Sequence, residues 1–171
     1  VPVGMLHSVA PSYNDHTRPV LSADYNLSER DQLRARWIGY RSASVDPSAQ
    51  LPEFHTPVQI RSQLASLAHF HTFSPALTNE LRFGYTRSVE DHPIGKYSFP
   101  GLDAFPNLDF DELGLSVGPH IAYPQSNRSN VFQLAENLSW VRGRHTMKFG
   151  YDGRKQNSSN FFVQLQRGDY E

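Results

Sequence analysis

The stretch Asn130–Gln156, NVFQLAENLSWVRGRHTMKFGYDGRKQ, carries the clearest structural signal in the sequence. Apolar and polar residues alternate on both sides of Gly143-Arg144, which is the pattern of two β-strands. Glycine at the first of two turn positions is typical of a type II′ hairpin. This turn predicts an apolar face and a polar face, each with its own cross-strand pairs. The pairs are Trp140 with Met147 and Leu138 with Phe149 on the apolar side, and Ser139 with Lys148 and Gln133 with Arg154 on the polar side.

Two further hairpins are predicted upstream. Residues 20–27 and 32–42 alternate in the same way around the polar link 29–31. If this link is a three-residue loop, Asp24 lies opposite Arg36. In the other hairpin, one arm ends near Phe73 and the second arm is Glu80–Arg87, with a turn at residues 74–78 that contains a proline.

The composition narrows the class of protein. The 171 residues are 38% hydrophobic with a mean hydropathy of -0.55, yet 12% are aromatic, which is unlike a disordered chain. No stretch approaches the roughly 18 to 20 apolar residues of a membrane helix. The absence of cysteine excludes disulfides and a thiolate nucleophile, and a net charge of -1 gives no field that favours nucleic acid.

The connections between the predicted strands differ strongly in length. Links inside the hairpins are short, whereas residues 43–59 and 89–129 are long and rich in Pro, Gly, Asp and Ser. Short turns alternating with long loops are typical of an outer-membrane β-barrel. We therefore predict an all-β fold, in which antiparallel hairpins form an open, curved segment of a transmembrane β-barrel. The predicted organisation is a loop at 1–19 entering from missing upstream sequence, a partial barrel at 20–171, and hairpins at about 20–42, 60–88 and 130–157.

The alternation assigns a side to each strand residue. The residues predicted to face lipid are Leu21, Tyr25, Leu33, Trp37, Leu81, Phe83, Leu138, Trp140 and Phe149. The residues predicted to face the lumen are Asp24, Arg34, Arg36, Arg82, Lys148, Asp152 and Arg154. Glu136 falls on the lipid side opposite Tyr151, where a carboxylate costs on the order of a few kcal/mol or less. A bulge, a Tyr151 hydroxyl partner and a different register are the three open explanations.

Two strings resemble one known family. SPALTNELRFGYTR (Ser74–Arg87) and NLSWVRGRHTMKFGYDGRKQ (Asn137–Gln156) look like the barrel of Oar-like TonB-dependent transporters of the bacterial outer membrane. Asp24-Tyr25-Asn26-Leu27 and the late Arg167-Gly168-Asp169-Tyr170 support the likeness. The resemblance implies a barrel of about 22 strands with an internal plug and uptake driven through TonB.

On this resemblance the chain is an internal fragment that is not active alone. Its expected partners are outer-membrane lipid, TonB through missing parts of the full-length protein, and an unknown transported solute, with no nucleic acid. The alternative is a soluble β-sandwich that binds carbohydrate or another ligand, because one wet face gives the same alternation. A sandwich would bury Trp37, Phe83 and Phe149 between two sheets.

No cofactor, metal or catalytic site is predicted, and the chain is not expected to be an enzyme. His69 and His71 have a spacing compatible with a metal pair, but no third ligand stands out, so we interpret them as lumen-facing polar residues near Arg82. Asp109-Phe110-Asp111-Glu112 lacks the glycine and spacing of an EF-hand and is interpreted, with Asp103, as part of a solvated acidic loop. No nucleophile, base and acid have the spacing of a catalytic constellation.

Overall fold

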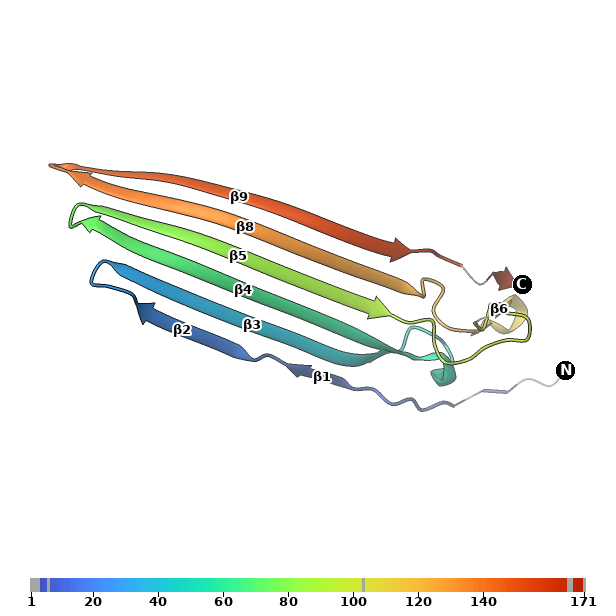
Figure 1. The fold of residues 1–171 in the computed structure, drawn as a ribbon. Helices are drawn as coiled ribbons and strands as arrows, with labels where there is room; N and C mark the ends of the chain where they lie inside the picture. The colour runs from blue at the N-terminus through green and yellow to red at the C-terminus, as the bar shows by residue number, and fades with distance from the viewer. Residues whose placement is uncertain (1–3, 6, 103, 166–167, 171) are drawn as a thin grey trace.

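The computed structural model describes the chain except residues 1–3, 6, 103, 166–167 and 171. Its dominant feature is one seven-stranded sheet built from long, nearly straight strands (Figure 1). These strands form where apolar and polar residues alternate between short turns, and each strand pairs with a neighbour in antiparallel fashion. The strands are β1 (Asn14–Thr17), β2 (Val20–Asn26), β3 (Asp31–Asp46), β4 (Thr56–Ser74), β5 (Leu77–His92), β8 (Gln125–Arg142) and β9 (His145–Phe162).

The first two strands form a single interrupted edge. Both β1 and β2 pair with β3, and Pro19 lies between them. Proline has no backbone N–H to donate, which confines it to edges and interruptions of a sheet. Its carbonyl still accepts a hydrogen bond from the Gly39 N–H at 2.9 Å, so the edge continues across the break.

The loops at one end of the sheet fold together into a cap, which we define as residues 47–55, 93–124 and 163–170 in their described parts. Phe54 packs against Tyr97 and Phe105, with ring centroids 5.7 and 4.9 Å away. The Leu165 N–H donates to the Ile121 carbonyl at 3.0 Å, which ties the C-terminal segment to the long loop. The cap contains η1 (Pro52–Phe54), η2 (Asp111–Leu113) and a small sheet of β6 (Asn107–Phe110), β7 (Leu115–Val117) and β10 (Asp169–Tyr170).

The all-β, open antiparallel architecture is confirmed, and the sandwich alternative is wrong. Phe83 and Phe149 are 47% and 56% exposed, so no second layer covers them. Within the described residues, no helix is long and apolar enough to cross a membrane.

The strands extend further than predicted because the alternating pattern of apolar and polar residues fades before the strand pairing ends. Residues 14–17 form a strand inside the expected N-terminal loop. The observed hairpins span 20–46, 56–92 and 125–162, the long connections shorten to 47–55 and 93–124, and the middle turn contains only Pro75 and Ala76.

The predicted register of the C-terminal hairpin is confirmed, whereas that of the first hairpin is wrong by two residues. Asp24 lies opposite Arg34, and Arg36 lies opposite Ser22. The loop keeps the expected length of three residues but lies one position earlier, at residues 28–30: the Leu27 N–H donates to the Asp31 carbonyl at 2.9 Å, and the Ser28 hydroxyl accepts from the Arg30 N–H at 3.1 Å. A shift of two residues keeps every side chain on its face, since strand side chains alternate with period two.

The tight turns are staggered along the sheet. Each hairpin reaches beyond the one before it: the Thr72 N–H donates to the Arg30 carbonyl, and the Val141 N–H donates to the Ala76 carbonyl, both at 2.8 Å. The line of turns in Figure 1 is therefore oblique to the strands. A stagger of about one residue per strand, with 3.3 Å rise and 4.8 Å spacing, inclines the strands by roughly 35°. This inclination lies in the range of transmembrane β-barrels.

Candidate functional site

The register sorts the side chains of the sheet onto two faces, because direct cross-strand partners share a side. All nine residues predicted to face lipid lie on one side, which we call the ring face: Leu21, Tyr25, Leu33, Trp37, Leu81, Phe83, Leu138, Trp140 and Phe149. All seven residues predicted to face the lumen lie on the other side, which we call the charged face: Asp24, Arg34, Arg36, Arg82, Lys148, Asp152 and Arg154. The two sets do not mix.

Large apolar side chains on the ring face form a band of limited height. On β8 the band runs from Trp140 near the turn to Phe132, eight residues further along the strand, and Glu136 interrupts it at its middle. This interval spans roughly 27 Å along the strand, or about 22 Å in height at the inclination above. The next ring-face residues toward the cap are polar, Asn130 on β8 and Arg87 on β5. The band therefore has nearly the 25 Å height of the apolar belt of an outer-membrane barrel.

The charged face carries a belt of ionic and polar contacts at the height of the apolar band. Asp152 accepts from the Gln133 amide at 2.6 Å and lies 3.4 Å from the Arg154 guanidinium. On β5, Arg82 forms an ion pair with Glu80. Arg34 places its guanidinium 4.8 Å from the centre of the Phe70 ring, on the same face. This arrangement satisfies charges along a wall that faces water rather than a protein core.

The cap is anchored at the far end of the charged face. The Tyr123 hydroxyl donates to the Asp46 carboxylate at the end of β3 and lies 2.9 Å from Nδ1 of His92 at the end of β5. Burial raises the pKa of the Tyr123 hydroxyl, and the hydrogen bond to Asp46 raises this pKa further. The hydroxyl therefore stays protonated and holds the long loop against two strands. Sequence patterns alone did not identify this contact, because its partners are separated by 77 and 31 positions.

The expected position of the two histidines is wrong. His69 lies opposite Leu81, and His71 lies opposite Asn79, so both side chains are on the ring face and not beside Arg82. Because β3 pairs with β4, Asp31 lies directly opposite His71 and joins the two imidazoles. Among the described residues, these three form a group of possible metal ligands. Each offers one ligand atom, and the three atoms lie within 4.8 Å of one another. The third ligand was missed because β3 and β4 are joined by the nine-residue connection 47–55, which is too long to specify how the two strands pair.

Glu136 and the acidic loop take defined positions. Glu136 lies opposite Tyr151 without a bulge, as the predicted register requires, and its carboxylate contacts the Asn79 amide at 3.5 Å.

In the acidic loop, Asp109 accepts a hydrogen bond from the Ser116 hydroxyl, and Asp111 begins η2. Asp103, also predicted in this loop, is outside the described residues, as is Arg167 of the late strand motif.

The two-faced sheet with inclined strands agrees with the comparison to known families. A family model described as outer membrane beta barrel domain matches residues 5–171. The chain belongs to this family. No curated protein and no solved structure matches it.

An outer membrane beta barrel domain lies in the outer membrane, and this localisation agrees with the sequence prediction. Its open sheet of staggered antiparallel strands is a segment of a barrel wall. A barrel wall separates hydrocarbon on the outside from a polar interior, so an outer membrane beta barrel domain needs two faces of opposite character.

Proposed function

We propose that this chain forms part of the wall of a TonB-dependent outer-membrane transporter of the Oar-like type. The ring face contacts outer-membrane lipid, and the charged face lines the passage for the solute. The observation that carries the proposal is the apolar band on the ring face, which matches the height of a bilayer and has the charged belt directly behind it. The assignment to the TonB-dependent type is supported by the two strings Ser74–Arg87 and Asn137–Gln156.

In this role the chain contributes shape and electrostatics rather than covalent chemistry. Arg34, Arg82 and Arg154 project from neighbouring parts of one face, each with an acidic or aromatic group nearby. Such a surface offers charged groups to a hydrated solute, while a neighbouring side chain interacts with each of these charges. The cap at the opposite end from the tight turns is the surface that a solute meets first, because long loops of outer-membrane barrels are extracellular. TonB acts through other parts of the full-length protein.

Adjacent residues on one strand test which face meets lipid. The chain has no cysteine, so Arg82→Cys and Phe83→Cys each add a single thiol to it. In the full-length protein any cysteine elsewhere is first replaced by serine, and each variant is then labelled with a fluorophore and reconstituted in vesicles. The two sites have the same depth but opposite faces. We expect brominated lipid to quench the label at position 83 and aqueous iodide to quench the label at position 82. Equal quenching of both labels by iodide, or the reverse pattern, would contradict the proposed faces.

The transporter type has its own test. We expect the purified full-length protein to bind the periplasmic domain of TonB in a surface plasmon resonance measurement. A protein with the expected quenching pattern but no TonB binding would be a barrel of another type. The two measurements therefore separate failure of the membrane assignment from failure of the TonB assignment.

A further inference from the structure

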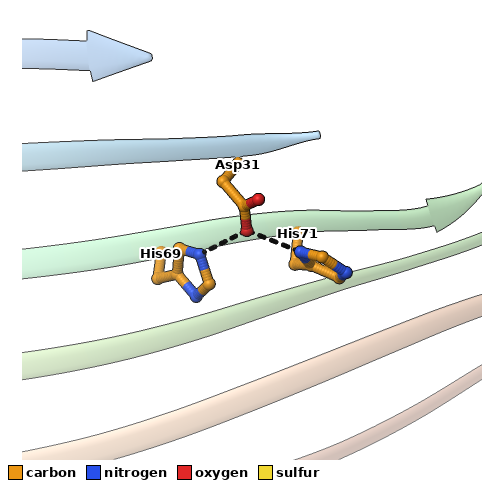
Figure 2. Close-up of side chains that lie close together, drawn as sticks. All are labelled: Asp31, His69 and His71. Carbon is orange, nitrogen blue, oxygen red and sulfur yellow. Dashed lines mark hydrogen bonds and ion pairs between the residues drawn. The ribbon is translucent and has the colours of Figure 1, made fainter. Parts of the chain in front are cut away.

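We propose that Asp31, His69 and His71 form a binding site for a divalent transition metal ion with the ligand preferences of Zn²⁺. The site lies on the ring face where β3 and β4 approach the tight turns (Figure 2). Two imidazole nitrogens and one carboxylate oxygen are a ligand set that catalytic zinc sites use, with the remaining position left to water. This proposal depends on local geometry and does not require the transporter assignment.

The donor atoms already converge. Oδ1 of Asp31 lies 2.6 Å from Nδ1 of His71 and 3.0 Å from Nε2 of His69. Figure 2 shows both rings directed at this one oxygen. A tetrahedral ion with bonds of 2.0 to 2.2 Å separates its ligand atoms by roughly 3.3 Å. Displacements of less than about 1 Å would therefore convert the hydrogen-bonded cluster into a coordination shell.

The backbone fixes this convergence. His69 and His71 are two residues apart on β4, which places both side chains on one face. Asp31 is the first residue of β3 and is paired with His71, so cross-strand pairing brings the carboxylate to the imidazoles. The side chains are partly exposed, by 39%, 27% and 29% for His69, Asp31 and His71. The described part of the chain therefore leaves these donors uncovered at the turn end of the sheet.

The surroundings provide an outer shell. The Ser28 hydroxyl donates to the second oxygen of Asp31 at 2.7 Å, which orients the carboxylate. Metal-bound imidazoles usually need an acceptor for the other ring N–H. Asn79 lies opposite His71, and its buried side-chain oxygen has no hydrogen-bond partner in the described part of the chain. The Phe73 ring packs edge-on against His71 at 4.3 Å and limits its rotation. These contacts are an independent indication of a ligand site.

The position of the site suggests its role. The hairpins of β4 with β5 and β8 with β9 are closed by tight turns, whereas β3 and β4 are joined by the nine-residue connection 47–55. One ion bound to Asp31 on β3 and to both histidines on β4 would connect these two strands at the end opposite their loop. The metal would therefore hold the register of a strand pair whose connection does not specify it.

Binding of Zn²⁺ alone to the metal-free full-length protein in detergent tests the site by isothermal titration calorimetry. Co²⁺ supplies a spectroscopic readout, because coordination changes its visible absorption. We expect His71→Asn and Asp31→Asn each to weaken binding by roughly 100-fold or more, and Ser28→Ala by roughly 10-fold, as for a group outside the coordination shell. His145→Asn is the matched control, since His145 is exposed at the same end of the sheet and outside the cluster. It should leave the affinity unchanged.

The outcomes decide the proposal. Failure of the wild-type protein to bind Zn²⁺ would overturn it, as would equal weakening by His145→Asn and His71→Asn. Far-UV circular dichroism checks the fold of each variant. If His71→Asn fails to fold, the test relies on the wild-type protein alone. Co²⁺ must then bind to it at one ion per chain and give the visible absorption spectrum of an ion held by nitrogen and oxygen ligands. A spectrum identical to that of Co²⁺ in buffer would contradict the site.

Discussion

The two halves of the same strands have opposite sidedness. Near the tight turns, the ring face is apolar and uncovered, while the charged face carries the ionic belt. Near the cap, the ring face instead carries Arg41, Arg61 and Arg128 in one cross-strand row, and the opposite face is packed beneath the long loop. Most buried side chains of the described residues lie in or beside the cap. On the proposed assignment of the faces, the medium on each side, rather than the strand itself, determines which face is apolar.

The length of the strands has the same explanation. Strands of 16 to 19 residues extend roughly 53 to 63 Å, which is about twice the length of the apolar band. On the proposed assignment, the half near the turns crosses the bilayer, and the half near the cap projects into water on the outside. A protein core is needed only in the projecting half, where the long loop supplies it.

The largest expected effect comes from a charge placed on the ring face of each half. Phe83→Arg introduces a guanidinium near the middle of the band and should lower the free energy of unfolding by about 2 to 4 kcal/mol. Ala43→Arg is the matched variant on the same face, in the projecting half, where Asp15 and Gln59 lie opposite it, and it should cost about 1 kcal/mol or less. Urea unfolding of the full-length protein in lipid vesicles measures both. Equal costs at the two positions would remove the proposed bilayer boundary between them.

An intermediate effect is expected in the cap. Tyr123→Phe removes the hydroxyl that donates to Asp46 and contacts His92, and loss of a partly buried hydrogen bond to a charged group should destabilise the loop by about 1 to 2 kcal/mol. Hydrogen exchange of residues 93–124 should accelerate, while the strand halves near the turns stay protected. Tyr97→Phe is the control, because its hydroxyl contacts Glu53 at an exposed site. Acceleration spread evenly over the whole sheet would show that the halves are not separate units.

Short-range sequence patterns predicted which side chains share a face of the sheet. Long-range strand pairing determined the histidine cluster and the anchor of the cap. The Gly143-Arg144 turn fixed one register correctly, and Gly143 has the positive φ of 59° that this turn needs. In the first hairpin the turn lies one residue earlier than predicted, at 28–30, and Ser28 closes it, which no alternation pattern shows. The Asp31 contacts to the histidines were missed because His69 and Asp31 are 38 positions apart and the long connection between their strands does not specify the pairing. The Tyr123 anchor was missed for the same reason.

The smallest effect tests the corrected register on the charged face. Asp24 lies directly opposite Arg34, whereas Arg36 is its diagonal neighbour. A double-mutant cycle between Asp24→Asn and Arg34→Gln should give a coupling energy of roughly 0.2 to 1 kcal/mol, because direct cross-strand charge pairs interact more strongly than diagonal ones. The cycle with Arg36→Gln is the matched control and should give a value near zero. Urea unfolding in vesicles measures both cycles. A larger coupling to Arg36 would return the loop to residues 29–31 and move the register of the first hairpin by two residues, leaving the division into ring and charged faces unchanged.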